Sequence, residues 1–198
     1  MQGIQLIVGL GNPGNEYSKT RHNAGFWWVD EVCAATATRL NHESKFHGQA
    51  GRIDGQGTWL LKPETWMNAS GRAVAALAKF YKIPAQAILV VHDELDLPVG
   101  SAKLKKGGGH GGHNGLRDII AQLESQDFWR LRIGIGHPGQ REEVVNFVLH
   151  APSLNEMNLI TRSIDDSAKL LPLLTQGEFE QAMLQLHTQP NEKKVSKP

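Results

Sequence analysis

Short apolar runs alternate with amphipathic segments along this chain, and this alternation restricts its fold more than any other feature. Runs of the kind that form buried strands occur at residues 4–8, 88–91 and 131–135. Apolar residues at helical spacing occur at 24–40, 67–81, 116–120, 144–149, 154–174 and 179–186. Strands that alternate with helices predict an α/β fold, in which a sheet lies between helical layers.

Antiparallel strands are expected beside the parallel ones. Residues 45–54 and 58–61 flank the glycine-rich turn 55–57, which is typical of a β-hairpin, and residues 103–105 are a further short strand. The sequence therefore predicts a three-layer α/β sandwich with a twisted, mostly parallel mixed sheet flanked by helices. Residues 1–188 are expected to form one domain, and the polar tail 189–198, which contains two prolines, is expected to be disordered.

The composition is that of an ordinary soluble globular protein. The 198 residues carry a formal net charge of +1, with 40% hydrophobic and 21% charged residues. Any contact with nucleic acid must therefore be local. The single Cys33 excludes an internal disulfide and suits a reducing compartment. No signal-peptide pattern is present, and the longest small apolar run, 73–78, is too short to span a bilayer. We therefore expect a cytoplasmic protein without membrane contact.

A glycine-rich segment at 107–115 (GGGHGGHNG) indicates a ligand. Six of its nine residues are glycine, and it leads into an amphipathic helix. Bare backbone N–H groups and a helix N-terminus favour anions. The stretch 101–117 contains no acid and four basic residues: Lys103, Lys105, Lys106 and Arg117. This predicts a phosphate-binding site; the alternative is a mobile surface loop with solvated lysines.

Residues 9–14 (GLGNPG) match the glycine pattern of dinucleotide-binding folds. In such a site the helix begins within the glycine run, so that its N-terminus meets the pyrophosphate. Here the helical pattern begins only at about Ala24, and no acid follows a clear second parallel strand. A dinucleotide cofactor is therefore disfavoured, and we interpret the tight turn as a means of aiming Asn12 and the loop after it.

Polar side chains that can perform acid–base chemistry follow several of the predicted strands. Loops after parallel strands meet at one edge of a sheet, so these residues are expected to share a cleft. His22 or His113 is a candidate general base, and Asp93 is a carboxylate that would orient it. Side-chain amides that could bind a polar backbone or an oxyanion are those of Asn12, Asn68 and Asn114.

The nucleophile is expected to be water. No serine or cysteine stands in a G-x-S-x-G context, so a hydrolase built from these residues would use water activated by histidine. A metal is the rival use of the histidines. His110 and His113 could supply two ligands, but the flexible glycines between them and the lack of a nearby Cys or Glu cluster disfavour this. The structural alternatives are that Asp93 and Asn68 are helix caps and Asn12 a turn residue.

Five segments together resemble the signature segments of bacterial-type peptidyl-tRNA hydrolases. They occur in the family's order and read IVGLGNPGNEYSKTRHNAG, TWMNASG, VHDELDLPVG, KKGGGHGGHNGLRDI and RLRIGIGHPG. The resemblance runs from about Ile4 to Leu186 and shows no departure at a functional position. Trp66 is a cosmetic difference, because aromatic residues of another type are also usual there.

The resemblance implies an enzyme that hydrolyses the ester between a peptide and the 3′ ribose of tRNA, and so releases tRNA for reuse in translation. It assigns catalysis to His22 as the base and Asp93 as its orienting partner. It also implies that a basic pair, Lys105 and Arg132, holds the tRNA 5′-phosphate. The residues implied to bind the peptidyl and terminal-adenosine end are Asn12, Tyr17, Met67, Asn68, His113 and Asn114. By the same resemblance we expect a monomer that uses no metal or other cofactor.

Two other functions stay open at this point. A non-catalytic RNA-binding relative on the same fold would not need the base and the carboxylate together. A peptidase on a similar α/β sandwich would cleave amides without tRNA, and would leave Lys105 and Arg132 without a role. Hydrolysis of a model peptidyl-tRNA separates the enzyme from both alternatives.

Overall fold

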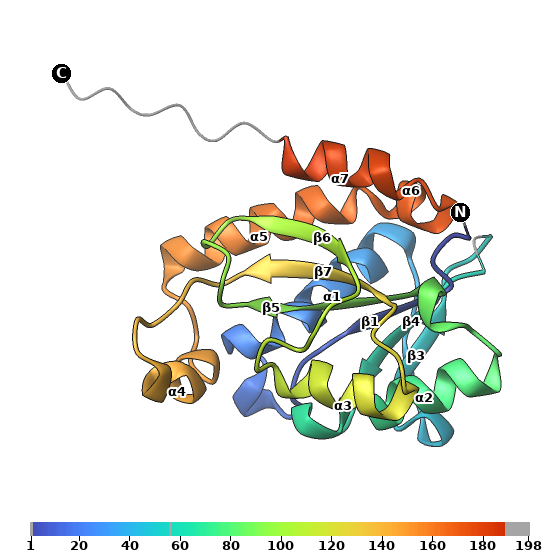
Figure 1. The fold of residues 1–198 in the computed structure, drawn as a ribbon, viewed down its shortest axis with the longest axis horizontal. Coiled ribbons are helices and arrows are strands. Elements are labelled where there is room, and N and C mark those ends of the chain that lie inside the picture. Colours follow the sequence, from blue (N-terminus) through green and yellow to red (C-terminus); the bar gives the residue numbers. More distant parts are fainter. Residues whose placement is uncertain (1, 56, 189–198) are drawn as a thin grey trace.

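The computed structural model describes residues 2–55 and 57–188, which form one mixed sheet with helices on both faces (Figure 1). This confirms the expected α/β class, whereas the expected tail from residue 189 lies outside the described residues. The sheet has seven strands in the order β2-β3-β4-β1-β5-β7-β6. The strands are β1 (Leu6–Gly9), β2 (Asn41–Glu43), β3 (Gly48–Arg52), β4 (Trp59–Pro63), β5 (Ile88–Glu94), β6 (Ala102–Lys106) and β7 (Trp129–Gly134).

Parallel pairings lie in the middle of the sheet, and antiparallel pairings lie toward its edges. β1 runs parallel to β4 and β5, and β5 runs parallel to β7. The expected hairpin is the antiparallel pair β3–β4, and β2–β3 and β6–β7 are also antiparallel. The described strands thus form three pairings of each kind, a smaller parallel share than expected. Because β1 and β5 are parallel neighbours, the segments that follow them leave the same edge of the sheet.

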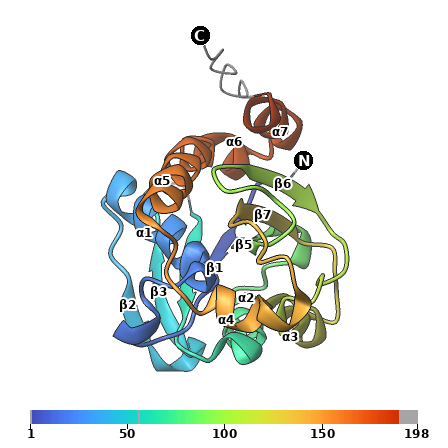
Figure 2. The same cartoon turned by 90° about the vertical axis from the view of Figure 1, so that its left-hand side faces the viewer.

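Helices cover both faces of the sheet, which completes three layers (Figure 2). The pair α2 and α3 packs on one face, and α1 packs on the other beneath α5. Among the described residues, no helix combines the length and the hydrophobicity that a membrane span requires. The α-helices are α1 (Ala24–Thr36), α2 (Ser70–Phe80), α3 (Asn114–Leu123), α4 (Val144–Val148), α5 (Leu154–Ala168), α6 (Leu171–Gln176) and α7 (Phe179–His187). Short 3₁₀ turns are η1 (Asn15–Tyr17), η2 (Arg21–Asn23), η3 (Ser44–Phe46), η4 (Met67–Ala69), η5 (Ala85–Ala87) and η6 (Arg141–Glu143).

The central strands bury side chains on both faces, as their continuous apolar sequences predict. In β1, Leu6 and Val8 contribute to the core beneath α2 and α3, whereas Ile7 contributes to the core beneath α1 and α5. All three side chains are fully buried, and each such burial stabilises the fold by about 1.5–3 kcal/mol. The two cores therefore hold β1 firmly from both sides, and with it the start of the loop at Leu10.

The structure corrects two expected helices. The helix expected at 24–40 ends at Thr36, because Ala37 adopts a left-handed backbone with φ of 53°. The residues after it form β2 and η3 rather than helix and hairpin strand. The helix expected at 154–174 divides into α5 and α6. Pro172 in the first turn of α6 has no N–H to bond the carbonyl of Ala168, so a continuous helix is excluded.

The C-terminal helix α7 covers the edge strand β6. The backbone N–H of Leu104 donates a hydrogen bond of 3.1 Å to Nε2 of His187. Phe179 at the start of α7 stacks on Trp129 of β7, with ring centroids 3.9 Å apart. An edge strand otherwise exposes unpaired backbone groups to other chains, and here a side chain satisfies one of them.

Candidate active site

His22 comes from the segment that follows β1 and Asp93 from the last residues of β5, and their side chains meet. His22 lies in η2, and Asp93 lies near the end of β5. Nδ1 of His22 is 3.0 and 2.9 Å from the two carboxylate oxygens, and both residues are buried. Gly25 makes this approach possible, because a Cβ atom there would lie 2.3 Å from the carbonyl oxygen of Val91. The sequence HNAG therefore seats the first turn of α1 directly on the strand ends.

His113 shares the same carboxylate, and its ring lies beside that of His22, with centroids 5.0 Å apart. Its Nε2 lies 2.9 Å from Oδ1 of Asp93. Its Nδ1 accepts hydrogen bonds from the backbone N–H groups of Gly115 at 3.2 Å and Leu116 at 3.4 Å, so His113 is the N-cap of α3. The expected open helix N-terminus in the glycine-rich segment is therefore wrong, because a side chain of the site occupies it.

The hydrogen bonds assign the two histidines different roles. Nδ1 of His113 accepts from the helix, so the proton of the neutral ring is on Nε2 and is donated to Asp93. Both nitrogens of His113 are thus engaged. His22 donates from Nδ1 to Asp93, and its Nε2 has no hydrogen bond to the described residues. Of the two candidate bases, only His22 has a nitrogen free to accept a proton.

Asp93 raises the basicity of His22. Burial by itself opposes protonation of His22, but the charge of Asp93 and its hydrogen bond outweigh burial and raise the pKa of the imidazole. Burial favours the protonated form of Asp93 as well. The charges and hydrogen bonds of His22 and His113 nevertheless hold the pKa of the carboxyl group well below its ordinary range. Asp93 is therefore an anion that stabilises the imidazolium form of His22.

His92 supports the site without taking part in acid–base chemistry. It is fully buried, and burial together with His113 lowers its pKa to about 3, so the ring stays neutral. Its Nδ1 donates to the carbonyl oxygen of Asp93 at 2.7 Å, and its ring meets His113 edge to face with centroids 5.0 Å apart. His92 thus packs beneath His113 and fixes the backbone that carries the carboxylate.

Asn12 is held by two hydrogen bonds to its backbone and by one that orients its side-chain amide. Its backbone N–H donates to Oδ1 of Asn23 at 2.8 Å, and Nδ2 of Asn23 donates to its carbonyl oxygen at 3.0 Å. Its own Oδ1 accepts from the backbone N–H of Met67 at 2.8 Å. Nδ2 of Asn12 has no hydrogen bond to the described residues. A fixed amide with a spare donor is suited to binding developing negative charge.

The remaining expected cleft residues lie on segments that start or end near this group. Tyr17 and Trp66 meet edge to face with ring centroids 5.6 Å apart, so η1 contacts the loop before η4. Met67 is buried. Asn68 and Asn114 are exposed, at η4 and at the first residue of α3. The structure thus holds Asn12 rigidly and leaves these two amides exposed.

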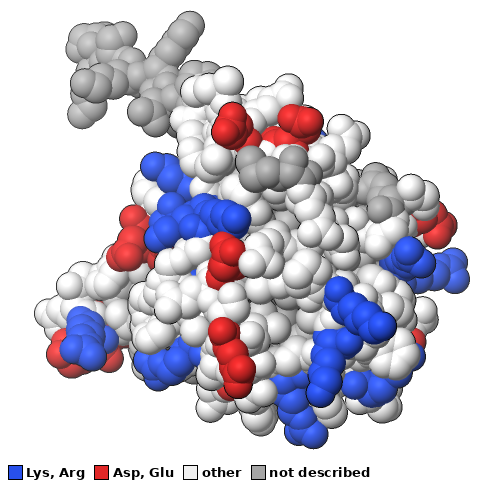
Figure 3. Space-filling view, turned by 45° about the vertical axis from the view of Figure 1, so that its right-hand side comes forward, with Lys and Arg blue, Asp and Glu red and all other residues white. Residues whose placement is uncertain are grey.

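The expected basic pair lies on the antiparallel strands β6 and β7. Lys105 is directly opposite Arg130, and Lys103 is directly opposite Arg132, so Lys105 and Arg132 are diagonal neighbours on one face of the sheet. Nη1 of Arg132 lies 3.6 Å from Glu94 Oε1. Figure 3 shows basic side chains gathered in separate areas of one molecular face, with acidic side chains between them. This arrangement agrees with the small net charge.

Relatives of known name match this chain over nearly its whole length. The sequence model of the family described as peptidyl-tRNA hydrolase matches residues 6–195. The chain belongs to this family. It is 67% identical over 189 residues to the peptidyl-tRNA hydrolase of Methylobacillus flagellatus, covering 95% of this chain and 98% of that protein. It is 57% identical to that of Nitrosospira multiformis, covering 94% and 98%. The crystal structure of peptidyl-tRNA hydrolase from Acinetobacter baumannii matches with a TM-score of 0.92 at 50% identity, covering 95% and 96% of the two chains.

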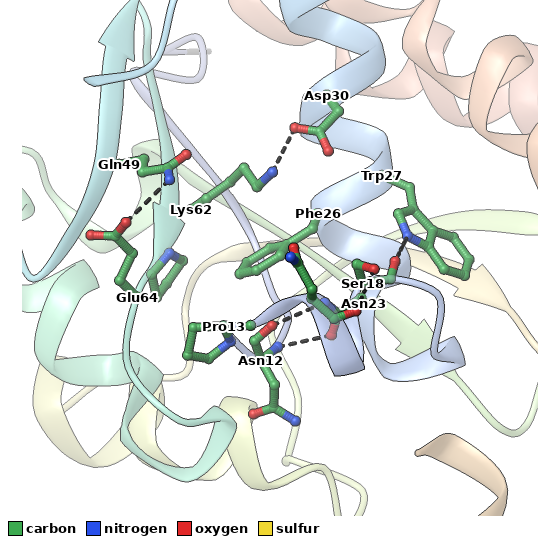
Figure 4. Close-up of a pocket in the computed structure, with 13 residues that line it drawn as sticks. Asn12, Pro13, Ser18, Asn23, Phe26, Trp27, Asp30, Gln49, Lys62 and Glu64 are labelled. Atoms are coloured by element: carbon green, nitrogen blue, oxygen red, sulfur yellow. Dashed lines mark hydrogen bonds and ion pairs between the residues drawn. The ribbon is translucent and has the colours of Figure 1, made fainter. Parts of the chain in front are cut away.

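A separate hollow lies beside the candidate active site of this peptidyl-tRNA hydrolase family member (Figure 4). Its volume is about 300 Å³, and it is lined from α1, the loop after β1 and the hairpin β3–β4. Lys62 and Asp30 form an ion pair of 2.6 Å across it. Asn12 and Asn23 reach its rim, but His22, Asp93 and His113 do not line it. The hollow therefore does not identify the candidate catalytic residues, and we assign His22, Asp93 and His113 from their hydrogen bonds instead.

The family member's three linked side chains also have the composition of a metal site. The ligand atoms of His22, Asp93 and His113 lie within 4.8 Å of one another. The atoms that face each other already form hydrogen bonds, which a metal would have to displace. The alternative pair His110 and His113 is weaker still, because both nitrogens of His113 are engaged and Nδ1 of His110 accepts from Gly112 at 3.0 Å. The hydrogen-bond geometry favours proton transfer over metal binding.

Sequence reasoning missed Arg130, which the structure places beneath the glycine-rich segment. Arg130 and Arg132 alternate with apolar residues on β7, a pattern typical of a strand with one solvated face. Arg130 is instead buried, and it donates hydrogen bonds to the carbonyl oxygens of Gly108 and Gly109. The only signal in the sequence was that Arg130 stands two residues before Arg132 and therefore on the same face of the strand. This signal does not distinguish a buried side chain from an exposed one.

Proposed function

We infer that this chain hydrolyses the ester that joins a peptide to the 3′ ribose of tRNA in peptidyl-tRNA. Membership of the peptidyl-tRNA hydrolase family supports this reaction and its substrate. The observation that carries the mechanism is the free Nε2 of His22, whose Nδ1 donates to the buried Asp93 carboxylate. This is the arrangement of a general base with an orienting anion.

The reaction requires only water and the ester. Nε2 of His22 takes a proton from a water molecule while the water oxygen attacks the ester carbonyl carbon. The carbonyl becomes an oxyanion, and Asp93 stabilises the imidazolium that has formed. When the tetrahedral species collapses, the bond to the ribose 3′ oxygen breaks and His22 returns its proton to that oxygen. The products are a peptide carboxylic acid and tRNA with a free 3′ hydroxyl.

Asn12 is the donor for the oxyanion. Its Oδ1 is occupied by the N–H of Met67, so Nδ2 is the part of the amide that is available. A donor fixed before the reaction needs no reorganisation when charge develops. Asn68 is exposed and has no such restraint among the described residues, so Asn12 is the stronger candidate of the two.

The other assigned residues bind the two ends of the substrate. Tyr17, Met67, Asn68, His113 and Asn114 surround the peptidyl and terminal-adenosine end. Lys105 and Arg132 hold the 5′-phosphate, a contact that is independent of base sequence and therefore suits any tRNA. Residues 1–188 act as one cytoplasmic catalytic domain and as a monomer, and the reaction uses no metal or other cofactor.

The decisive experiment measures release of tRNA from N-acetyl-aminoacyl-tRNA in the presence of a chelator. Wild type should release tRNA rapidly, and His22→Ala should lose most of the turnover while still binding substrate. His42→Ala is the matched control, because His42 lies on β2 at the far edge of the sheet. Binding of tRNA without release by the wild type would favour the RNA-binding relative, and loss of wild-type activity in chelator would overturn the metal-free mechanism.

A further inference from the structure

Arg130 is a buried cation beneath the glycine loop, which we define as residues 107–112. Arg130 is 3% exposed and its guanidinium stacks over the ring of Phe128, 4.7 Å from the centroid. No ion pair to Arg130 is formed by the part of the chain that the structure describes. Glu94, the acid whose charge acts on it, pairs with Arg132 at 3.6 Å. Burying a charge without a close counter-ion costs folding free energy. We therefore expect Arg130 to have a function that offsets this cost.

The guanidinium holds the middle of the glycine loop to the sheet. Its Nη1 donates to the carbonyl oxygen of Gly109, and its Nη2 donates to that of Gly108. The loop otherwise begins with a bond of 2.9 Å from Gly107 N–H to the Phe128 carbonyl, and Gly112 bonds back to His110 within the loop. Four of its glycines have positive φ, so the sequence itself restrains the loop very little.

Lys105 lies against the same glycine that Arg130 holds. The two residues are directly opposite each other in the antiparallel pair β6–β7. A Cβ atom on Gly108 would lie 2.9 Å from Nζ of Lys105, so the ammonium group sits where any other residue would place a side chain. Lys105, Arg130 and Arg132 therefore lie on one face of the two strands, with Gly108 between Arg130 and Lys105.

We propose that Arg130 is a positioning residue that shapes the glycine loop and Lys105 into a seat for the 5′-phosphate of tRNA. This inference rests on the proposed function, in which Lys105 and Arg132 hold that phosphate. By drawing the carbonyl oxygens of Gly108 and Gly109 inward, Arg130 turns their negative ends away from an incoming phosphate. Its buried positive charge adds to the attraction. A bound phosphomonoester in turn supplies the counter-charge that the folded chain does not place beside Arg130.

The inference predicts an effect on binding rather than on the chemical step. His113, at the far end of the loop, is held independently by Asp93 and by the first N–H groups of α3. Loss of Arg130 should therefore leave His22 and Asp93 in place. A role confined to folding would lower stability without making the enzyme indifferent to the 5′ end of its substrate.

The test compares peptidyl-tRNA carrying a 5′-phosphate with the same substrate dephosphorylated to a 5′-hydroxyl. We expect Arg130→Met to raise KM for the phosphorylated substrate about tenfold, the effect of losing a charged hydrogen bond, with kcat within about twofold. KM for the 5′-hydroxyl substrate should hardly change. Arg130→Lys keeps the charge but cannot bridge two carbonyl groups, so it should show most of the same effect. Arg52→Met, on exposed Arg52 of β3, is the matched control.

Each outcome decides a different point. If the wild type treats both substrates alike, the phosphate contact itself is wrong and the role of Arg130 falls with it. If the wild type prefers the 5′-phosphate and Arg130→Met keeps that preference in full, only the Arg130 inference is overturned. A wild-type KM in Arg130→Lys would show that charge suffices and that the bridged carbonyls are irrelevant. Thermal unfolding of both variants establishes that they are folded, and Arg130→Lys carries the test if Arg130→Met is not.

Discussion

The side-chain oxygen of Asn12 accepts a hydrogen bond of 2.8 Å from the backbone N–H of Met67, although 55 positions separate them in sequence. This contact ties the loop after β1 to the turn before α2, and it decides which end of the Asn12 amide is free. The position that we assign to the oxyanion therefore depends on both the loop after β1 and the turn before α2, which the sheet brings together.

Asn12→Asp should lower kcat more than a substitution at any of the other residues that we assign to substrate binding. The aspartate still accepts from Met67, but it replaces the free donor with a second oxygen of negative charge. Loss of an oxyanion donor costs on the order of 10²–10³ in rate, and repulsion adds to this loss. Single-turnover hydrolysis measures the effect, with Asn68→Asp as the matched comparison. An equal or larger loss in Asn68→Asp would reverse our choice of donor.

The pH dependence of kcat/KM should report the ionisation of His22. The base must be neutral to accept a proton, and Asp93 raises its pKa above the ordinary 6.5. Activity should therefore rise with pH along a limb whose midpoint lies above 6.5. In Asp93→Asn the negative charge is gone while burial remains, so the limb should move to lower pH as the plateau falls. A midpoint unchanged by Asp93→Asn would contradict the assignment of the limb to His22.

The plateau activities should rank the two residues. His22→Ala removes the base, whereas Asp93→Asn only misorients it and withdraws its stabilising charge. The loss in Asp93→Asn should therefore be the smaller of the two at the optimal pH of each enzyme. A larger loss in Asp93→Asn would show that the base had been assigned to the wrong residue.

Two variants of His113 should separate its bond to Asp93 from its role as a helix cap. His113→Ala removes both and should lower the free energy of unfolding by about 1 kcal/mol through loss of the cap. His113→Asn restores a side chain that caps helices well, but is too short to replace the imidazole at Asp93. Both variants should lower kcat by about tenfold, which is about 1.4 kcal/mol of activation free energy. This loss is smaller than the loss expected for His22→Ala. Denaturant unfolding and kcat measured on the same samples distinguish the roles; stability loss without rate loss would make His113 a cap only.

Lys105→Ala should raise KM and leave kcat nearly unchanged, because we place Lys105 in substrate binding only. The adjacent Lys106 is the matched control: it pairs with Asp127 at 3.5 Å and neighbours the ring of Trp129. Since few phosphates are neutralised, raising the salt concentration should weaken wild-type binding gently and Lys105→Ala binding less. A fall in kcat with an unchanged KM would remove Lys105 from the phosphate contact.

Much of the fold is local enough to be predicted from sequence. The apolar runs at 88–91 and 131–135 became β5 and β7, and the helical pattern at 67–81 became η4 and α2. The break at Pro172 and the left-handed Ala37 were missed, because apolar spacing continues through both positions. Short β2 was missed because its sequence, Asn-His-Glu, has no apolar residue, and only its pairing with β3 defines it as a strand.

The site was predictable as a set of residues but not as a set of roles. His22, Asp93 and His113 were expected together because loops after parallel strands converge. That reason holds for His22 and Asp93, whereas β6, the strand before His113, is antiparallel to β7, and His113 reaches Asp93 only by way of the glycine-rich segment. Which histidine is free depends on the tautomer of His113, and that is set by the backbone N–H groups of α3. No pattern in the sequence states that a histidine in a glycine-rich segment will cap the helix after it. Burial of Arg130 depends in the same way on a loop folding back over its strand.

The edge strand β6 is covered by α7, which is synthesised later than β6. A ribosome makes β6, with its lysines, long before it makes α7, and until then the backbone of this strand has an open side. The hydrogen bond from the backbone N–H of Leu104 to His187 can form only after α7 has been made. Burial and the charges of Lys103 and Arg132 lower the pKa of His187 and so keep the ring able to accept this bond. Helix α7 thus protects the edge of β6, and a chain truncated before Phe179 would expose the unpaired backbone of this strand to other molecules.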